Sequence, residues 1–460
     1  MEKIFNLKAV ADAVGGKLLD ADEEKIIENV SIDSRTINKG ELFVAIRGNT
    51  DGHKYINNAL ENGAVCVIAD KKASVADGTP RIIVEDTGKA LLDLSGAYRK
   101  KMNIPIIAVT GSVGKTSTRT IIGCVLSRKY TTLVTEGNFN NEIGVPLTLF
   151  NISKEHQIAV IEMGMNHFGE LSKITAAVRP DVVVITNIGE SHIENLGSKE
   201  GILKAKLESL EGLTPDGTVV LNGDDELLWN LNGSLNFETL YCGINNLKSD
   251  ICAKNIKTYP QSTEFTFYYG DNEYQAELTV PGGHHVYNAL LSVLIGIKYN
   301  IPIDDILMGI YDFAPRGMRQ ATVKIGDYTV IKDCYNASPV SMKSGLEVLK
   351  LNQSGKRKVA CLGDMLELGT ITEKAHRETG EEVVAYGADV LITVGERAKL
   401  IAQGAISSGM SRKKVYSFLT TEELCKKLHT ILESGDVILL KASRLMEFEN
   451  IASYMEEHMK

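Results

Sequence analysis

The chain has 460 residues, enough for two to four domains of ordinary size. Its 43% hydrophobic and 24% charged residues are typical of a globular protein, and its net charge of −9 disfavours a nucleic-acid partner. The seven cysteines include no C-x-x-C pair, which indicates reduced thiols and not disulfides or a zinc site. No signal peptide begins the chain and no apolar run approaches about 18 residues, so we expect a cytoplasmic protein without membrane insertion.

The first hundred residues alternate strand-like and helix-like segments. Apolar runs at 40–48 and 64–69 predict strands, and residues 90–101 predict a helix that leads to a domain boundary near residue 99. Several polar residues fall at strand ends or in loops, where ligands of α/β sheets tend to bind. These are Ser34, Arg35, Asp51 and His53. A role in a turn or helix cap is about as well supported for each, and Arg35 is the best phosphate-binding candidate.

A strand, a glycine-rich turn and a helix follow one another from residue 106. Residues 106–109 suit a buried parallel strand, and the next residues suit an anion-binding turn that opens a helix near Lys115. The full P-loop spacing would place glycine where the chain has Val109, so the pattern is the shorter G-x-x-G-K-T. A purely structural turn is the alternative, but the position between strand and helix favours a nucleoside triphosphate site. The residues that would contact it are Gly111, Ser112, Val113, Gly114, Lys115, Thr116 and Ser117.

Two further polar features follow this turn. Residues 135–146 are dense in turn formers, and the amides of Asn138, Asn140 and Asn141 favour a substrate-contacting loop over a plain connection. The next apolar run, from residue 158, ends in Glu162. A carboxylate at the end of a strand beside a P-loop strand is the expected Mg²⁺ partner, although such a residue alone could be merely solvated.

The middle of the chain offers weaker signals. Residues 181–189 predict a third strand that leads to His192, which on its own would more often be structural. The helix predicted over 199–210 carries Lys206, and a helical lysine usually lies on a solvated face. Residues 248–280 alternate in the manner of antiparallel strands, and Asn288 falls on the first turns of a later helix.

A linker over 314–319 leads into a third α/β unit. Its predicted strands lie at 328–332, 358–362, 389–394 and 436–441, and each ends in a polar or glycine-rich loop. Alternating strands and helices imply a parallel sheet with ligand contacts at the carboxyl ends of its strands.

These motifs together resemble the Mur ligase family over the whole chain. Those in the middle of the chain are Thr110-Gly-Ser-Val-Gly-Lys-Thr116, Glu162-Met-Gly164, Thr186-Asn187 with His192, Ala205-Lys206-x-Glu208, Asn222-x-Asp224-Asp225, and His284 with Asn288. Those in the last third are Arg319, Asp333-x-Tyr-Asn-Ala-x-Pro339, Gly363-Asp-Met-x-Glu-Leu-Gly369 and His376. The motifs that end at Pro339 and Gly369 resemble those of the family member that adds D-alanyl-D-alanine to UDP-N-acetylmuramoyl-tripeptide.

Two N-terminal motifs, Asp33-Ser-Arg35 and Asp51-Gly-His53, are shared with the lysine- or diaminopimelate-adding member. That member is the alternative within the family, but its Asp-Asn-Pro-Arg motif does not occur here. A regulatory P-loop GTPase would need an Asn-Lys-x-Asp motif, which is also absent. A non-catalytic nucleotide-binding scaffold would not need Lys115, Thr116, Glu162 and His192 together.

The resemblance implies an α/β fold with three-domain Mur ligase architecture. A UDP-substrate-binding domain would span 1–98, a central ATP-binding P-loop domain with a parallel sheet 99–314, and a Rossmann-like ligase domain 315–460. The implied reaction is ATP-dependent ligation through an acyl phosphate in cytoplasmic peptidoglycan precursor synthesis. ATP and Mg²⁺ would be the cofactors, and we expect a monomer.

The family pattern also implies a role for each candidate residue. Catalysis would involve Lys115, His192 and Lys206. Mg²⁺ would be held by Thr116, Glu162, His192 and Lys206, the lysine as a carbamate. Besides the P-loop, ATP would meet Asn288, Arg319, Asp333 and Tyr335. The UDP-linked substrate would meet Ser34, Arg35, Asp51 and His53 through its nucleotide, and Asn138, Asn140 and Asn141 through its muramoyl-peptide.

Overall fold

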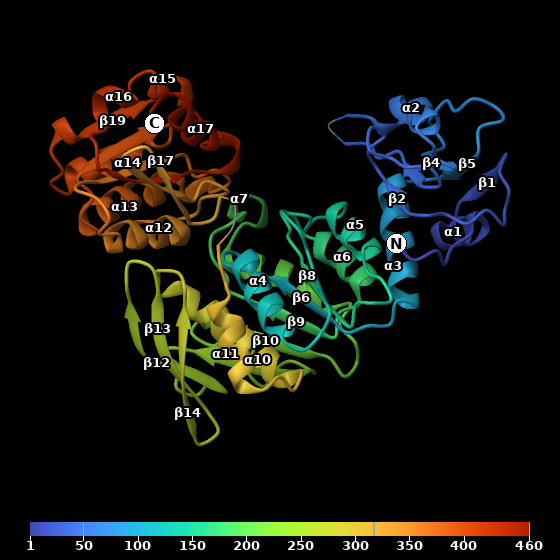
Figure 1. Ribbon diagram of the computed structural model, residues 1–460, viewed down its shortest axis with the longest axis horizontal. Coiled ribbons are helices and arrows are strands. Elements are labelled where there is room, and N and C mark those ends of the chain that lie inside the picture. The colour runs from blue at the N-terminus through green and yellow to red at the C-terminus, as the bar shows by residue number, and fades with distance from the viewer. Residues whose placement is uncertain (49, 316–317, 460) are drawn as a thin grey trace.

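The computed structural model describes residues 1–48, 50–315 and 318–459. Within these residues the strands form three sheets, of five, nine and six strands, and each sheet builds one lobe of an open V-shaped molecule (Figure 1). We call them the N-terminal, central and C-terminal lobes. The predicted linker over 314–319 includes Arg316 and Gly317, which lie outside the described residues. In the described part of the chain, no helix is both long and apolar enough to cross a membrane.

The N-terminal lobe is built on a small sheet with the strand order β1-β5-β4-β3-β2. Its strands are β1 (Lys17–Leu19), β2 (Val30–Ser31), β3 (Leu42–Val44), β4 (Cys66–Asp70) and β5 (Arg81–Val84), and its helices are α1 (Leu7–Val14) and α2 (Ile56–Glu61). Only β1 runs antiparallel to its neighbour. Strand β3 is shorter than the predicted 40–48, because the chain turns back after it and Arg47 forms a bridge with Asp51.

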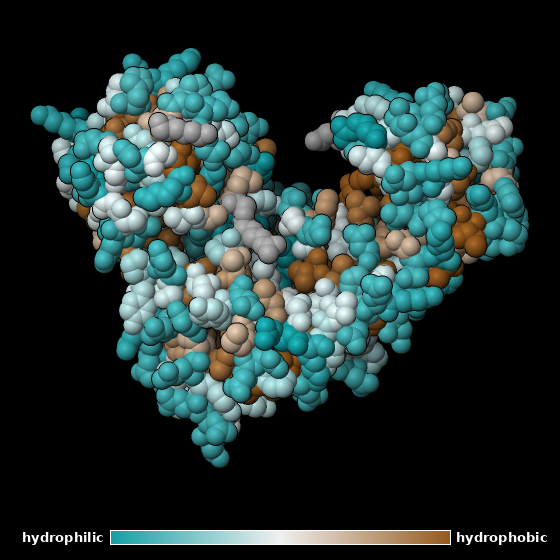
Figure 2. All heavy atoms as spheres, viewed as in Figure 1, coloured by the Kyte–Doolittle hydropathy of each residue, from teal (hydrophilic) through white to brown (hydrophobic). Residues whose placement is uncertain are grey.

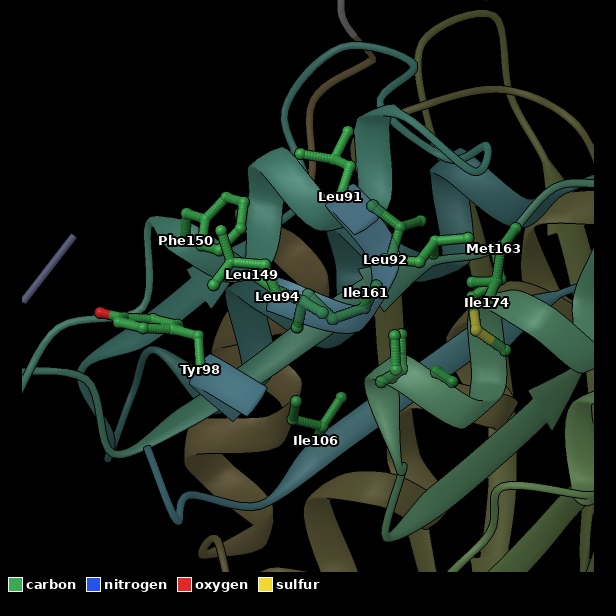
Figure 3. Close-up of a cluster of buried hydrophobic side chains, with 14 of the residues drawn as sticks. Leu91, Leu92, Leu94, Tyr98, Ile106, Leu149, Phe150, Ile161, Met163 and Ile174 are labelled. Atoms are coloured by element: carbon green, nitrogen blue, oxygen red, sulfur yellow. The ribbon is translucent and has the colours of Figure 1, made fainter. Parts of the chain in front are cut away.

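Helix α3 (Thr87–Lys101) joins the N-terminal and central lobes through a shared core. Figure 3 shows its side chains, among them Leu94 and Tyr98, beside Leu149 and Phe150 of α5 (Gly144–Phe150). The Tyr98 hydroxyl donates a hydrogen bond to the main chain of Ile152 and accepts one from Glu2 N at 2.8 Å. The first two lobes therefore share one continuous hydrophobic cluster.

The central lobe places the predicted phosphate-binding turn at the end of an inner strand of a large sheet, with the order β14-β13-β12-β11-β10-β9-β6-β8-β7. Its strands are β6 (Ile106–Thr110), β7 (Thr132–Val134), β8 (Ile158–Glu162), β9 (Val182–Ile185), β10 (Thr218–Asn222), β11 (Glu238–Gly243), β12 (Ile251–Thr258), β13 (Thr263–Tyr269) and β14 (Asn272–Leu278). Strands β7 to β12 pair in parallel, and β12 to β14 form the predicted antiparallel segment. The carboxyl ends of β6, β8 and β9 thus meet at one edge.

Helices cover both faces of this sheet. One face carries α4 (Lys115–Leu126), α10 (His284–Lys298) and α11 (Ile303–Tyr311). The other carries α5, α6 (Glu170–Val178) and α8 (Lys199–Leu207), next to α3. The short helices α7 (Ile193–Leu196) and α9 (Glu226–Trp229) follow β9 and β10.

The C-terminal lobe contains a six-stranded sheet with the order β15-β16-β20-β17-β18-β19. Its strands are β15 (Ala321–Ile325), β16 (Tyr328–Lys332), β17 (Lys358–Gly363), β18 (Val390–Val394), β19 (Val415–Phe418) and β20 (Val437–Lys441), of which only β15 pairs antiparallel. Helices α12 (Pro339–Leu351), α13 (Thr372–Ala385) and α14 (Lys399–Ser407) cover one face, and α15 (Thr421–Cys425), α16 (Leu428–Ile431) and α17 (Glu449–His458) the other. The predicted α/β class is confirmed.

Candidate active site

A cleft of about 400 Å³ lies between the central and C-terminal lobes. Figure 2 shows a broad hollow above the central lobe, between the N-terminal and C-terminal lobes. Many of the predicted site residues line this cleft, although they come from distant parts of the chain. They are Ser112, Val113, Gly114, Lys115, Ser117, Asn140, Asn141, His192, Asn288, Arg319, Asp333 and Tyr335. The structure thus brings the glycine-rich turn together with the loop that follows β16.

Two glycines allow the turn after β6 to adopt its shape. Gly111 has φ of 144°, and a Cβ there would lie 1.9 Å from the Thr186 hydroxyl. Gly114 has φ of 87°, and a Cβ there would lie 2.8 Å from Oδ1 of Asn288. Any side chain at either position would be strained and would collide with a neighbour. The turn leads directly into the N-terminus of α4, which favours a bound anion.

Lys115 lies at the start of α4, with its ammonium group folded over the turn. Its Nζ donates hydrogen bonds to the carbonyls of Gly111 at 2.8 Å and Ser112 at 3.3 Å. Burial lowers the pKa of Lys115 to about 8, and the nearby Arg319 acts in the same direction. A phosphate in the cleft would supply the negative charge that favours the protonated amine.

The loop after β9 supports the turn from below. Asn187 accepts a hydrogen bond from Val113 N at 3.0 Å and donates one to Val113 O at 2.9 Å. Ser112 N donates to the Asn187 carbonyl at 3.0 Å, and Gly189 N donates to the Ser112 hydroxyl at 2.9 Å. Val113 is among the residues predicted to contact ATP, and its main-chain N–H and C=O are already bonded inside the protein.

Thr116 and Glu162 meet beneath the turn, as the predicted metal site requires. The Thr116 hydroxyl donates to Glu162 Oε2 at 3.0 Å, and the Glu162 side chain is fully buried. Glu162 also accepts a hydrogen bond from Asn140 at 2.8 Å and pairs with Arg119 at 2.9 Å. A hydroxyl beside a carboxylate is a donor set that suits Mg²⁺, so these two residues fit the ion.

The other two predicted metal ligands do not form a ready-made cage with this pair. In the described ranges, no three His, Cys, Asp or Glu side chains are clustered closely enough to hold a metal ion. Lys206 is 3% exposed on α8, and burial together with the charge of Lys115 lowers its pKa well below the usual value. The alternative of a solvated helical lysine does not hold for Lys206, because its face of α8 packs inside the central lobe.

The predicted nucleotide residues Asn288, on α10 of the central lobe, and Arg319 and Tyr335, in the C-terminal lobe, line the cleft together with the turn. Asn288 accepts a hydrogen bond from the Thr118 hydroxyl at 3.0 Å, and the preceding turn of α10 places His285 next to it. His285 Nε2 lies 3.1 Å from Oε1 of Gln320, and burial lowers the pKa of this histidine to about 4. The Arg319 guanidinium stacks 4.0 Å from the centre of the Tyr335 ring, a flat cationic surface inside the cleft.

Asp333 forms a buried ion pair with Lys441. Lys441 Nζ donates to Oδ2 of Asp333 at 2.7 Å, from the end of β20 to the end of β16. Burial raises the pKa of the Asp333 carboxyl, and Lys441 opposes that effect. Sequence reasoning missed Lys441, although its position at the carboxyl end of a parallel strand was a usable signal.

His192 reaches the C-terminal lobe directly. Its Nδ1 lies 2.6 Å from Oε2 of Glu367, a close contact without the alignment of a linear hydrogen bond. The imidazole lowers the pKa of Glu367. Sequence reasoning placed Glu367 in a family motif but gave it no role, because nothing in the sequence relates positions 192 and 367.

The predicted substrate residues divide into two groups. Asn140 and Asn141 line the cleft, but both side-chain amides also form hydrogen bonds within the protein. Asn140 donates to Glu162, and Asn141 accepts from the main chain of the first turn of α5. Asn138 supports the same loop through its carbonyl, which accepts from Asn140 N at 2.7 Å. The second group lies in the N-terminal lobe, outside the cleft.

That second group is partly engaged in internal contacts. The exposed Arg35 side chain forms a two-bond pair with Asp33, and lowers the pKa of that carboxyl to about 2. Ser34 is buried nearby, and its carbonyl accepts from Asn62. The 3₁₀ turn Gly52–Tyr55 begins at Asp51, which accepts from His53 N and lies 2.7 Å from His53 Nδ1.

A glycine-rich turn at the head of a central parallel sheet, facing a second α/β lobe across a cleft, defines a nucleoside triphosphate-dependent enzyme. The chain matches three family models: "Mur ligase family, catalytic domain" over residues 26–110, "Mur ligase middle domain" over 109–296, and "Mur ligase, glutamate ligase domain" over 318–444. The chain belongs to the Mur ligase family.

Relatives and solved structures agree with this assignment. The chain is 35% identical to UDP-N-acetylmuramoyl-tripeptide–D-alanyl-D-alanine ligase of Bacillus subtilis (strain 168) over 98% of both chains. It is 31% identical to the Escherichia coli (strain K12) ligase of the same name, again over 98% of both. The crystal structure of MurF from Acinetobacter baumannii superposes with a TM-score of 0.89, at 29% identity over 98% of this chain and 99% of that one. MurF ligase from Thermotoga maritima in complex with ADP gives 0.81, at 28% identity over 94% and 97%.

Proposed function

We propose that this protein is the ATP-dependent ligase that joins D-alanyl-D-alanine to UDP-N-acetylmuramoyl-tripeptide in peptidoglycan precursor synthesis. The observation that carries the proposal is the cleft that unites the turn at 111–117 with Arg319, Asp333 and Tyr335. Relatives over nearly the full length that bear this activity in their names support the choice of substrates. The domain division 1–98, 99–314 and 315–460 and a cytoplasmic location are part of the proposal.

A carboxylate does not accept an amine without activation. In the proposed reaction, the terminal carboxylate of the tripeptide attacks the γ-phosphorus of ATP, and ADP leaves. The amine of D-alanyl-D-alanine then attacks the carbonyl of the acyl phosphate and inorganic phosphate leaves, so that the new peptide bond is formed at the expense of one ATP. The protein's part is to position the reactants and to neutralise the phosphoryl oxygens.

The residues of the cleft suit these tasks. Lys115 would leave the carbonyls of Gly111 and Ser112 to contact the β- and γ-phosphates, while the first amides of α4 point at the same oxygens. Arg319 and Tyr335 offer a stacked surface on the C-terminal side of the cleft. On the central side, Asn288 lies beside the turn. Closing the lobes over the reactants would keep water from the acyl phosphate.

A divalent cation fits beneath the turn. Thr116 and Glu162 would hold one Mg²⁺, and His192 and Lys206 would contribute to a second. The ion would offset the negative charge of the transferred phosphoryl group. An ammonium group cannot bind a cation, so Lys206 would act as its carbamate. Its buried position and lowered pKa favour the neutral amine, which is the form that reacts with CO₂.

The defining experiment is a phosphate-release assay with each reactant omitted in turn. We expect phosphate release from ATP only when UDP-N-acetylmuramoyl-tripeptide and D-alanyl-D-alanine are both present. Turnover with lysine or diaminopimelate on the UDP-dipeptide would instead assign the alternative family member. Phosphate release that ignores both peptide substrates would contradict the ligase proposal.

Lys115→Ala is the first variant to test in this assay. Loss of the lysine removes a preorganised charge at the transferred phosphoryl group, and we expect turnover to fall by about a hundredfold or more. Lys129→Ala is the matched control and should remain active. Lys129 follows the end of α4, and its ammonium group donates a hydrogen bond to the main-chain carbonyl of Asn300. Near-normal turnover by folded Lys115→Ala enzyme would contradict the assigned role.

A further inference from the structure

Glu367 belongs to the C-terminal lobe and contacts the central lobe at the edge of the cleft. Its Oε2 lies 2.6 Å from Nδ1 of His192, and its main-chain carbonyl accepts a hydrogen bond from Glu194 N at 3.1 Å. The two lobes that it joins have separate apolar clusters in the described part of the chain. The polar contact at His192 therefore links lobes that hydrophobic packing leaves independent.

The backbone on both sides is shaped for this contact. His192 and Glu367 both have φ of 64°, a left-handed conformation that is uncommon for residues other than glycine. Gly369, two residues beyond Glu367, also has a positive φ, and a Cβ there would lie only 3.3 Å from the Cα of Glu194. Two loops with unusual local geometry thus present one imidazole and one carboxylate to each other.

The loop that carries Glu367 is anchored within its own lobe. Met365 N donates to Nε2 of the buried His376 at 3.1 Å, and Nδ1 of His376 lies 2.7 Å from the Thr372 carbonyl. Leu366 N donates to the Ser443 hydroxyl at 2.9 Å. These bonds fix the main chain just before Glu367, so the position of its carboxylate follows the position of the whole C-terminal lobe.

The orientation of the His192 ring indicates which of its two nitrogens is available to bind a metal. A histidine that binds a metal through one nitrogen usually donates the N–H of the other to a carboxylate or carbonyl, which sets its tautomer and direction. Here Nδ1 faces Glu367 while His192 lines the cleft, which leaves Nε2 as the nitrogen available to a ligand.

We propose that Glu367 is a positioning residue for the divalent-cation site: its carboxylate keeps the proton of His192 on Nδ1 and leaves Nε2 to bind the cation. The inference rests on the proposed role of His192 as a metal ligand. Because Glu367 moves with the C-terminal lobe, the cation site is complete only when that lobe is docked. Metal binding and lobe docking are then coupled, and each strengthens the other.

The test measures Mn²⁺ bound by the full-length protein in the presence of ADP, followed by the electron paramagnetic resonance signal of free Mn²⁺. We expect Glu367→Gln to bind Mn²⁺ about 10- to 100-fold more weakly than the unaltered protein. Affinity for ADP without metal should be unchanged. Glu396→Gln is the matched control, because this exposed carboxylate lies in the same lobe and pairs only locally with Lys399. Glu367→Ala provides a second variant if the glutamine variant folds poorly.

His192→Ala separates the two ways in which the idea can fail. If His192→Ala leaves Mn²⁺ affinity unchanged, the proposed metal role of His192 is wrong and the inference falls with it. If His192→Ala weakens Mn²⁺ binding while both Glu367 variants match the unaltered protein, Glu367 only forms a polar contact between the lobes and does not position His192. Pulsed resonance spectra add a direct readout: the imidazole-nitrogen coupling to Mn²⁺ should vanish in His192→Ala and weaken in Glu367→Gln.

Discussion

Lys206 and Lys204 stand two positions apart on α8, in opposite environments. Lys206 is buried, and its ammonium group has the like charge of Lys115 nearby. Lys204 is exposed and lies over the ring of Phe168, at 5.9 Å. An uncompensated buried cation is costly, so the charged form of Lys206 is disfavoured. Conversion to a carbamate would exchange that cation for an anion beside Lys115.

The first prediction follows from this difference. Lys206→Ala should lose most ligase activity, and small carboxylic acids should restore part of it by returning an anionic acceptor to the emptied space. Protein equilibrated with ¹³C-bicarbonate should show a carbamate carbon resonance that Lys206→Ala lacks and the control Lys204→Ala retains. A fully active Lys206→Ala enzyme would exclude the catalytic role, and an inactive variant that no carboxylate restores would leave the carbamate unsupported.

A second prediction concerns the acid stability of the N-terminal lobe. Hydrogen bonds from Arg47 lower the pKa of Asp70 to about 2, against burial, which acts in the opposite direction. Since the pKa is lower in the folded protein, this stabilisation is present above about pH 4 and is lost as the pH falls toward 2. Converted in full, the pKa shift of Asp70 corresponds to about 2.5 kcal/mol in the free energy of unfolding. Because Arg47 is half-exposed and solvent screens its charge, we expect about 1 kcal/mol.

Urea unfolding of Asp70→Asn at two pH values provides the measurement. The variant should be less stable than the unaltered protein at pH 7, and the difference should shrink at pH 3. Asp77→Asn is the control, because the Asp77 side chain is fully exposed. A difference in unfolding free energy that is equal at both pH values would contradict the ion-pair explanation.

At the scale of elements, the loop after β9 and the turn after β6 act as one unit. Asn187 bonds both the N–H and the C=O of Val113, and Thr186 donates to the same carbonyl at 2.6 Å. Asp225, at the start of α9, accepts from Ile188 N at 2.7 Å and so fixes the loop from the other side. The turn therefore keeps its anion-binding shape before any nucleotide arrives.

We predict that Asn187→Ala weakens nucleotide binding without unfolding the protein. The variant leaves the main-chain N–H of Val113 without its partner, while the carbonyl keeps its bond from Thr186. We expect a cost of about 1–3 kcal/mol, which corresponds to about a 5- to 150-fold loss of ADP affinity by calorimetry. Asn195→Ala, which alters an exposed side chain on α7, should behave like the unaltered protein. Equal ADP affinity in the two variants would show that Asn187 is dispensable for the turn.

Helices and strands were predictable where the hydrophobic pattern and the turn-forming residues around it agree. The strands β6 and β8 and the start of α4 at Lys115 lie where the sequence predicts them, because an apolar run and a glycine-rich turn leave few alternatives. The end of β3 was not predictable, because the bridge between Arg47 and Asp51 is a tertiary event. Site residues supplied by motifs converge in the cleft, whereas Lys441 and Glu367 depend on partners 108 and 175 positions away, which periodicity does not reveal.

At the scale of the whole molecule, the distribution of apolar clusters indicates which lobe moves. One cluster runs from Phe5 to Tyr241 and unites the N-terminal and central lobes, whereas the clusters of the C-terminal lobe contain only residues from 318 onward. Contacts between the last two lobes include polar ones, such as the pair of His192 and Glu367. Interfaces without a large hydrophobic area usually permit relative motion of domains.

The last prediction is that ligands draw the C-terminal lobe onto the central lobe. Lys115 belongs to the central lobe, whereas Asp333 and Tyr335 follow β16 in the other, so ATP would gain contacts from both sides when the cleft narrows. Small-angle scattering should show a smaller radius of gyration with a non-hydrolysable ATP analogue and UDP-N-acetylmuramoyl-tripeptide at saturation. Lys115→Ala, with weakened nucleotide binding, should compact less at the same ligand concentrations. An unchanged scattering profile under saturating ligands would mean that the cleft between the central and C-terminal lobes already has its working width, and that the enzyme must protect the acyl phosphate without lobe closure.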